Sequence, residues 1–223
     1  MASRLVDMVH FSSPVMENND LMRIRAKAKF WDGIVVPYAE VERYIEEDDA
    51  ILIGPGMERG EETRRIVNNL LKKYPHKKWI VDGGALQEVD PLLLTKNMII
   101  TPNHKELEIV KNKLGAQYAS VKATILAKGP SDTITQEDQN TSITGGSPGL
   151  TRGGTGDVLA GLVLGLSAKS EAFPSCLVAS YCLKHASESL SNKVGPFFSP
   201  TDLIAQIPHT LNSLLTTQEL SHP

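Results

Sequence analysis

Short apolar runs alternate along this chain with segments whose apolar residues recur at helical spacing, and this alternation limits the fold more than any other feature. The runs are apolar at consecutive positions, as expected of strands buried on both faces of a parallel sheet. Six strands are expected, at Val6–Phe11, Gly33–Val36, Ala50–Ile53, Trp79–Asp82, Met98–Thr101 and Thr124–Ala127. Parallel strands need crossover connections, so the sequence predicts an α/β fold with three layers, in which helices flank an open, mostly parallel sheet.

The helical segments fall between the strands and dominate the last third of the chain. In one of them, Ile66, Leu70 and Leu71 form an apolar stripe that a helix would bury. Helices are expected at Tyr38–Glu47, Glu61–Tyr74, Lys105–Leu114, Asp157–Ala168, Phe173–Asn192 and Pro200–Leu215. Two β-rich runs, Asp132–Gln136 and Thr141–Thr144, predict a hairpin at the later edge of the sheet.

The composition is that of one enzyme-sized domain, expected over residues 1–223 because no repeat, linker or low-complexity segment divides the chain. With 26 acidic against 23 basic residues the net charge is −3, which argues against a nucleic-acid partner. The longest apolar stretch, Val158–Leu166, is too short to span a bilayer, and the start of the chain lacks a signal-like stretch. Cys176 and Cys182 lie in an apolar helical segment without metal-ligand spacing. We therefore expect a cytoplasmic protein with no membrane partner.

The segment Gly153–Asp157 reads Gly-Gly-Thr-Gly-Asp and stands directly before the apolar run Val158–Leu166. Small residues allow a tight turn with bare N–H groups, and the following helix directs its positive end to the same place, so the segment predicts an anion site. Asp157 falls in the first helical turn, where it could take a proton from a hydroxyl that attacks a bound phosphate. The alternative is a glycine-rich helix start that Asp157 only caps.

Glycines and polar residues follow four of the expected strands, at the edge where ligands of open parallel sheets gather. These segments are Gly54-Pro55-Gly56, Asp82-Gly83-Gly84, Thr101 to Glu106 and Lys128 to Asp132. Among their residues, Asp82, Asn103, Glu106 and Lys128 supply metal-binding, hydrogen-bonding and charge-neutralising groups. One such turn is ordinary, whereas four at one edge indicate a binding site.

Taken in order, these motifs resemble those of the ADP- or ATP-dependent NAD(P)H-hydrate dehydratases, members of the ribokinase-like superfamily. The resemblance extends from near the N-terminus to about Gly195. The motifs that carry it are Gly54-Pro55-Gly56, Val81 to Leu86, Thr101 to Glu106, Ala127-Lys128-Gly129 and Gly153 to Gly161. The resemblance implies a ribokinase-like fold and a repair enzyme that acts on hydrated NADH or NADPH, with ADP or ATP and Mg²⁺ as cofactors. Such an enzyme phosphorylates the hydroxyl at C6 of the reduced nicotinamide ring and then eliminates phosphate to restore the double bond.

The same resemblance implies roles for individual residues. Asp157 is implied as the general base, and the N–H groups of Gly153–Gly156 as donors to the transferring phosphoryl group. Substrate binding is implied for Gly56, Asn103, His104, Lys105, Glu106 and Asp157. Cofactor binding is implied for Lys128, Gly129, Pro130, Ser131, Asp132, Gly146, Gly153, Gly154, Thr155 and Gly156, and no metal ligand is assigned. The alternative for Asn103 is a helix N-cap, and for Lys128 a solvated lysine at a strand end.

Three features depart from the usual pattern of the family. The chain is expected to start inside the family's first helix, at Ala2–Leu5, and to lack the first Gly-rich strand and turn that reach the substrate. Glu58 stands where a glycine is common, near an anionic substrate, and Gly84 stands where a second aspartate is usual. Two alternatives therefore stay open: a superfamily kinase for a vitamin precursor or sugar, and a nucleotide-binding module without turnover. Self-association through an exposed sheet edge or the apolar segment Phe173–Leu183 is compatible with the sequence.

Overall fold

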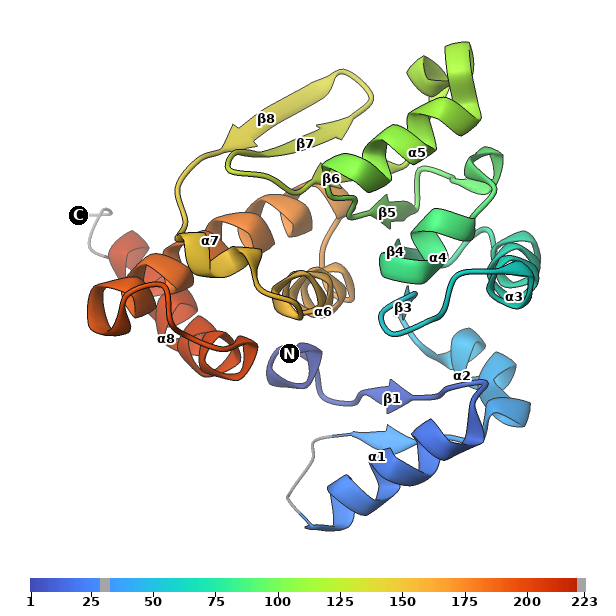
Figure 1. Cartoon of the computed structure of the whole chain (residues 1–223), viewed down its shortest axis with the longest axis horizontal. Coiled ribbons are helices and arrows are strands. Elements are labelled where there is room, and N and C mark those ends of the chain that lie inside the picture. The colour runs from blue at the N-terminus through green and yellow to red at the C-terminus, as the bar shows by residue number, and fades with distance from the viewer. Residues whose placement is uncertain (29–32, 220–223) are drawn as a thin grey trace.

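The computed structural model describes residues 1–28 and 33–219, and its centre is a six-stranded sheet (Figure 1). The strands follow one another in sequence order as β3 (Ala50–Ile53), β4 (Lys78–Val81), β5 (Met98–Ile100), β6 (Thr124–Ala127), β7 (Asp132–Gln136) and β8 (Gln139–Ile143). Strands β3 to β6 are parallel, and β7 and β8 extend the sheet as an antiparallel hairpin. The expected open, mostly parallel sheet is confirmed. The last strand begins at Gln139 rather than at Thr141, because Glu137 turns the chain with a φ of 49°.

Helices cover both faces of this sheet (Figure 1). One layer consists of α3 (Glu61–Lys73), α4 (Gly83–Glu88) and α5 (His104–Leu114), which connect the parallel strands. The other layer consists of α6 (Thr155–Ser167) and α7 (Ala172–Val194), with α8 (Pro200–Glu219) packed against both. The helix α2 (Val41–Glu47) precedes β3, and 3-10 turns lie at Ala2–Arg4, Tyr38–Glu40, Pro91–Leu93, Gly115–Ser120 and Pro148–Thr151. Among the described residues, no helix is long and apolar enough to cross a bilayer.

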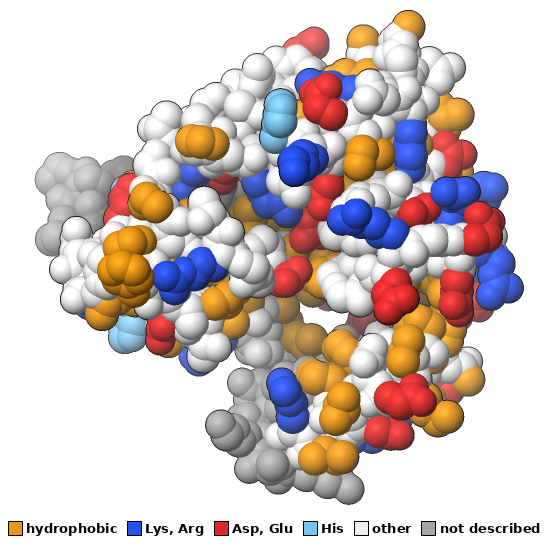
Figure 2. Space-filling view, in the orientation of Figure 1, with side chains coloured by type: hydrophobic (Ala, Val, Ile, Leu, Met, Phe, Trp, Pro, Cys, Tyr) orange, Lys and Arg blue, Asp and Glu red, His pale blue; other side chains and the backbone are white. Residues whose placement is uncertain are grey.

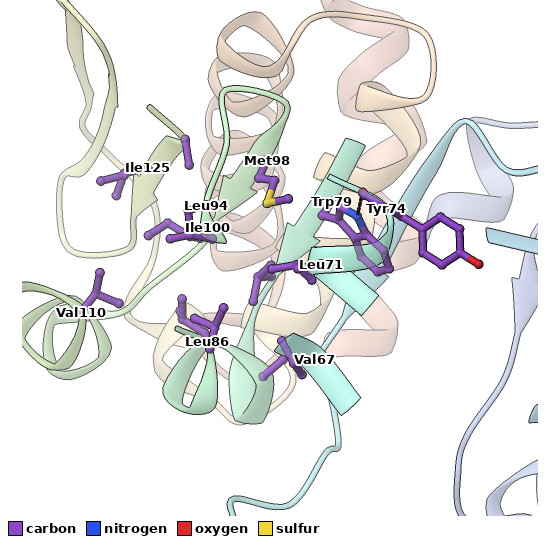
Figure 3. Close-up of a cluster of buried hydrophobic side chains, with 14 of the residues drawn as sticks. Val67, Leu71, Tyr74, Trp79, Leu86, Leu94, Met98, Ile100, Val110 and Ile125 are labelled. Carbon is purple, nitrogen blue, oxygen red and sulfur yellow. Dashed lines mark hydrogen bonds between the residues drawn. The ribbon is translucent and has the colours of Figure 1, made fainter. Parts of the chain in front are cut away.

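Successive residues of the central strands face opposite helix layers, which produces two cores. In β4, Trp79 and Val81 pack into the core beneath α3, α4 and α5, whereas Ile80 packs into the core beneath α6, α7 and α8. Figure 3 shows the first core, in which the indole Nε1 of Trp79 donates a 2.9 Å hydrogen bond to the Tyr74 carbonyl. All three strand residues are fully buried, which is why the strand reads as a continuous apolar run.

The first two expected strands do not join the main sheet. Instead, β1 (His10–Phe11) and β2 (Ile34–Val35) pair in parallel as a separate two-stranded sheet, with α1 (Met16–Ala28) between them in the chain. The expectation of sheet strands over Val6–Phe11 and Gly33–Val36 is therefore wrong in both length and placement. Burial explains the difference, because Met8 and Ile34 are 54% and 47% exposed and lack the two-sided covering that the apolar pattern suggested.

The chain begins with the 3-10 turn Ala2–Arg4, which packs on α6. Small residues on α6 make room for it: a Cβ on Gly161 would lie 3.2 Å from the Met1 Cβ, and one on Gly165 would lie 2.8 Å from Leu5 Cδ1. The start of the chain thus packs against α6 at Gly161 and Gly165. This is the helix that begins at the glycine run.

Candidate active site

The turn into α6 is fixed by one glycine and one threonine. Gly154 adopts a φ of 93°, a left-handed conformation that side chains disfavour. The Thr155 hydroxyl donates to the carbonyls of Leu150 and Arg152, at 2.6 and 2.8 Å, and its N–H also donates to Arg152 at 3.3 Å. Thr155 therefore shapes the turn with its side chain, which leaves its implied cofactor contact a prediction.

The N–H groups around this turn are available to a ligand. Within the described residues, the amides of Gly153, Gly154, Gly156 and Asp157 donate to no protein acceptor. Unpaired amides at a helix start carry partial positive charge and attract anions. The structure thus brings the expected glycines together as a cradle suited to a phosphate.

Asp157 stands at the rim of this cradle with its side chain reaching solvent. Partial burial of the carboxyl raises its pKa, the charge of Asp82 raises it further, and Lys128 opposes both. A raised pKa makes the carboxylate a stronger proton acceptor, as general-base chemistry requires.

An ion pair with Asp82 places the Lys128 ammonium group beside the same helix start. Lys128 Nζ lies 2.8 Å from Asp82 Oδ1, and the Asp82 side chain is only 3% exposed. A Cβ on Gly156 would lie 3.4 Å from that Nζ, so the ammonium group is next to the first turn of α6. Lys128 is therefore not the freely solvated lysine of the alternative interpretation, and it can neutralise an anion held by the cradle.

The ends of three neighbouring strands place the expected rim residues side by side. Asp82 follows β4, Asn103 follows β5 and Lys128 follows β6. Asn103 and Lys128 form an isolated parallel bridge, and the Lys128 N–H donates to the Pro102 carbonyl at 2.7 Å. The expectation that these groups share one edge of the sheet agrees with this arrangement.

Asn103 and Glu106 form a capping box at the start of α5. The Glu106 N–H donates to Asn103 Oδ1 at 3.0 Å, and the Asn103 N–H donates to Glu106 Oε2 at 2.9 Å. The side-chain carbonyl of Asn103 thus caps the helix, as the alternative interpretation expected. The Asn103 NH₂ has no protein acceptor within the described residues, and Asn103, His104 and Lys105 are all exposed. Glu106 is buried, so its implied contact with substrate stays a prediction.

The turn after β3 accounts for two of the departures from the family pattern. A Cβ on Gly84 would lie 2.1 Å from the Met57 carbonyl oxygen, so an aspartate does not fit where this turn lies against α4. A Cβ on Gly54 would lie 1.8 Å from the Asp82 carbonyl oxygen, which ties the same turn to the rim. Glu58 points into solvent, and Gly56 is exposed with open space around it and a φ of 74°.

The remaining residues with implied cofactor contacts lie in two adjacent segments. Asp132 is buried and accepts hydrogen bonds from the Gly129 N–H at 2.9 Å and the Ser180 hydroxyl at 2.7 Å, so it organises its own loop. Pro130 and Ser131 are exposed at that loop. Gly146, in the second segment, donates its N–H to Glu188 Oε1 at 2.7 Å.

Three α7 side chains that were not expected from the sequence hold these two segments: Ser180, Lys184 and Glu188. Lys184 is 2% exposed, although it sits in a helix expected from its apolar residues. A lone lysine within an apolar helical stretch was the available signal, because a buried ammonium group needs several acceptors around it.

Beside the site, the space-filling view shows a hollow between the part formed by β1, α1 and β2 and the part that carries the main sheet (Figure 2). Acidic and hydrophobic side chains lie at the margin of this hollow (Figure 2). Within the described residues, no group of three or more His, Cys, Asp or Glu side chains could hold a metal ion.

Known sequences that are similar to this chain carry names that refer to NAD(P)H-hydrate repair. A family model described as NAD(P)H-hydrate dehydratase matches residues 6–209. A bifunctional NAD(P)H-hydrate repair enzyme of Methanocaldococcus jannaschii is 34% identical over 165 residues, which are 73% of this chain and 33% of that protein. An ADP-dependent (S)-NAD(P)H-hydrate dehydratase of Staphylococcus aureus is 30% identical over 188 residues, which are 77% of this chain and 67% of that protein. The chain spans about a third to a half of the length of the first curated relatives that it matches.

Solved structures share the fold. A ribokinase-like superfamily protein of Enterococcus faecalis superposes with a TM-score of 0.74 at 22% identity, covering 95% of this chain and 80% of that one. The ADP/ATP-dependent NAD(P)H-hydrate dehydratase of Bacillus subtilis, co-crystallised with ATP and Mg²⁺, gives a TM-score of 0.70 at 20% identity, covering 92% and 78%. The family model covers nearly the whole chain and the fold is ribokinase-like, so the chain belongs to the NAD(P)H-hydrate dehydratase family.

Proposed function

We propose that this chain restores hydrated NADH or NADPH to the intact dinucleotide in a reaction driven by ADP or ATP. The observation that carries the proposal is the start of α6, where four unpaired amides, the Lys128 ammonium and the Asp157 carboxylate meet. Membership of the dehydratase family supports the choice of substrate. Residues 1–223 would act as one functional domain.

Asp157 is the proposed general base. It would take the proton of the C6 hydroxyl as that oxygen attacks phosphorus, and its raised pKa suits this role. The unpaired amides of Gly153, Gly154 and Gly156 would donate to the phosphoryl oxygens, and such preorganised donors contribute on the order of 3 kcal/mol each when they act on developing charge. The nucleotide, shortened by one phosphate, leaves as the ester forms. Breakage of the bond between C6 and the phosphate oxygen, with loss of a proton from the neighbouring ring carbon, then restores the double bond of the ring.

The bound nucleotide supplies the phosphoryl group that turns a poor leaving group into a good one. Lys128 and the unpaired amides of the cradle would hold its terminal phosphate, and the segments Gly129–Asp132 and Gly145–Ser147 would line the rest of the nucleotide. Mg²⁺ ordinarily enters such sites on phosphate oxygens with one or two carboxylates, and Asp82 and Asp157 are the carboxylates at this rim. The donor set therefore fits a nucleotide-borne Mg²⁺ better than a separate protein site.

The substrate half of the site would lie at the ends of β3 and β5. The free NH₂ of Asn103 and the exposed His104 and Lys105 offer donors and positive charge to a dinucleotide, and the open space at Gly56 permits close approach. We also propose a cytoplasmic location, which is supported by two free, buried cysteines, Cys176 and Cys182. Self-association stays a prediction.

The test is incubation of the purified protein with hydrated NADH and either ATP or ADP in the presence of Mg²⁺. Absorbance of the reduced nicotinamide and release of inorganic phosphate should rise together with one stoichiometry. A stable phosphorylated product would instead identify a small-molecule kinase, and nucleotide binding without product would identify a module without turnover. Either result would refute the proposal.

Asp157→Asn is the decisive variant. Asp138→Asn is its matched control because Asp138 is exposed in the turn between β7 and β8 and is not among the residues of the proposed site. Loss of a general base typically lowers the rate by about 10²–10⁴-fold. We expect kcat to fall by that factor in Asp157→Asn. The affinity for ATP and ADP measured without Mg²⁺ should stay within about threefold of the parent, which corresponds to about 0.7 kcal/mol. A kcat for Asp157→Asn equal to that of Asp138→Asn would exclude Asp157 as the base.

A further inference from the structure

One face of α7 carries polar side chains although the helix is packed in the protein interior. Ser180, Lys184, Ser187 and Glu188 recur at the spacing that places side chains on one side of a helix. Each of them contacts either the loop that follows β6 or the segment that follows β8. These are the two segments proposed above to line the nucleotide.

Lys184 joins the two segments directly. Its Nζ donates to the carbonyls of Gly129 and Pro130, at 3.2 and 3.1 Å, and to the carbonyl of Gly145 at 3.2 Å. These contacts use all three donors of a lysine ammonium group. The carbonyls belong to segments about sixteen residues apart in sequence, and no other described side chain bonds to both.

The charge of Lys184 is balanced by Asp132. The Lys184 Nζ lies 3.5 Å from Asp132 Oδ1, and the two side chains are 3% and 6% exposed. The carboxylate in turn receives the Gly129 N–H and the Ser180 hydroxyl. Buried ionic groups of this kind are weak sources of stability, because the cost of removing them from water offsets their attraction. A role in fixing geometry accounts better for such a group than stability does.

A second anchor on the same face holds the neighbouring glycine. Glu188 Oε1 accepts the Gly146 N–H at 2.7 Å, and a Cβ on Gly145 would lie 2.6 Å from the same oxygen. Gly145 and Gly146 have φ values of 97° and 91°, so this stretch takes a shape that few other residues adopt. Ser187 Oγ adds a contact to the Ser147 N–H at 3.0 Å.

We propose that Lys184 is a positioning residue for the nucleotide: by joining the Gly129–Pro130 and Gly145 carbonyls, it sets the width of the nucleotide-binding groove from α7. The inference rests on the proposed function in so far as these segments contact a nucleotide. The residue touches neither substrate nor nucleotide, so its removal should affect nucleotide affinity and leave the chemical step intact.

The experiment compares Lys184→Met, which keeps the length of the side chain and removes its charge and donors, with Lys193→Met, an exposed position on the same helix. Affinity for ATP and for ADP with Mg²⁺ is measured by calorimetry, together with kcat, the KM for each substrate and circular dichroism. We expect Kd and KM for nucleotide to rise about tenfold or more in Lys184→Met, a change of at least about 1.4 kcal/mol, with kcat at saturating nucleotide and the KM for hydrated NADH within about threefold of the parent. Lys193→Met should match the parent throughout.

A second variant covers the case in which Lys184→Met does not fold. Glu188→Ala removes the anchor of Gly146 at a half-exposed position, and it should raise the nucleotide Kd by about threefold or more without changing kcat. A folded Lys184→Met, or Glu188→Ala in its place, that binds ATP and ADP within about twofold of the parent would overturn the inference. Parallel loss of nucleotide affinity, hydrated-NADH affinity and kcat would overturn it too, since that pattern marks a general structural role.

The two proposals fail in different ways. If the parent protein binds ATP or ADP but does not repair hydrated NADH, the proposed function is refuted while the calorimetric test of Lys184 remains valid. If the parent repairs hydrated NADH and the α7 variants bind nucleotide normally, only the inference about Lys184 is refuted. A parent protein that binds neither nucleotide refutes both.

Discussion

Replacement of Gly84 by alanine tests whether a close contact with the Met57 carbonyl outweighs the usual preference of helices for alanine over glycine. Gly84 is the second residue of α4, where alanine in place of glycine ordinarily stabilises a helix by about 0.5–1 kcal/mol. Here a Cβ would lie 2.1 Å from the Met57 carbonyl oxygen and 2.9 Å from the carbonyl carbon. These are backbone atoms, so relief requires the whole Gly54–Met57 turn to shift. The contact therefore reverses the sign of the usual effect.

The size of the effect follows from two opposing contributions. Extra volume forced into a packed region costs about 1–3 kcal/mol. After subtraction of the gain in helix propensity, we expect Gly84→Ala to lower the free energy of unfolding by up to about 2.5 kcal/mol. For a chain of this length that corresponds to a fall in Tm of up to about 10 °C.

Urea unfolding followed by circular dichroism measures this change as a lower midpoint at an unchanged slope. Gly156→Ala is the matched control, because Gly156 is the second residue of α6 and its Cβ would meet only the flexible Lys128 Nζ, at 3.4 Å. The control should be as stable as the parent or more stable. A Gly84→Ala protein that is also stabilised would refute the reasoning about the Met57 contact.

Three further results are expected. Asp82→Asn removes a charge that raises the pKa of Asp157, so the acidic limb of the kcat–pH profile should move to lower pH, and an unmoved limb would show that the two carboxyls do not interact. Burial raises the pKa of the Cys176 and Cys182 thiols to about 12 and about 11. Both should therefore resist iodoacetamide at about pH 8 in the folded protein and react in urea. Labelling of the folded protein, measured by mass spectrometry, would contradict this. Thr155→Val removes both hydroxyl hydrogen bonds at the α6 turn and should lower the free energy of unfolding in urea by about 1–3 kcal/mol. The exposed Thr151→Val should lower it by less than about 0.5 kcal/mol. Equal losses would show that the Thr155 hydroxyl does not stabilise the turn.

The parts of the fold that sequence reasoning predicted correctly are those where burial is uniform. The strands β3 to β6 have a helix layer on each face, so apolar residues are favoured at successive positions. The strands therefore read as continuous apolar runs in the sequence. The rim residues Asp82, Asn103 and Lys128 were predictable for a related reason, because the ends of adjacent parallel strands must share an edge.

The parts that were not predictable depend on contacts distant in sequence. Nothing local distinguishes the apolar run at β1 from a sheet strand, although its neighbour Met8 is largely exposed. The role of Lys184 depends on carbonyls more than thirty residues away, which no spacing rule within α7 reveals. Likewise, the Gly84 position becomes intelligible only once Met57 is seen against it.

Successive residues of a central strand pack into different cores, so substitutions at adjacent positions can affect the two halves of the proposed site independently. Ile80 supports the layer that carries the glycine cradle and α7, whereas the next residue, Val81, supports the layer that carries α5 and its capping box. Truncation of Ile80 would loosen the half of the site that we propose for the nucleotide, and truncation of Val81 the half that we propose for the dinucleotide. Selection acting on a single strand could thus tune affinity for two different ligands through neighbouring residues, without altering any residue that touches either one.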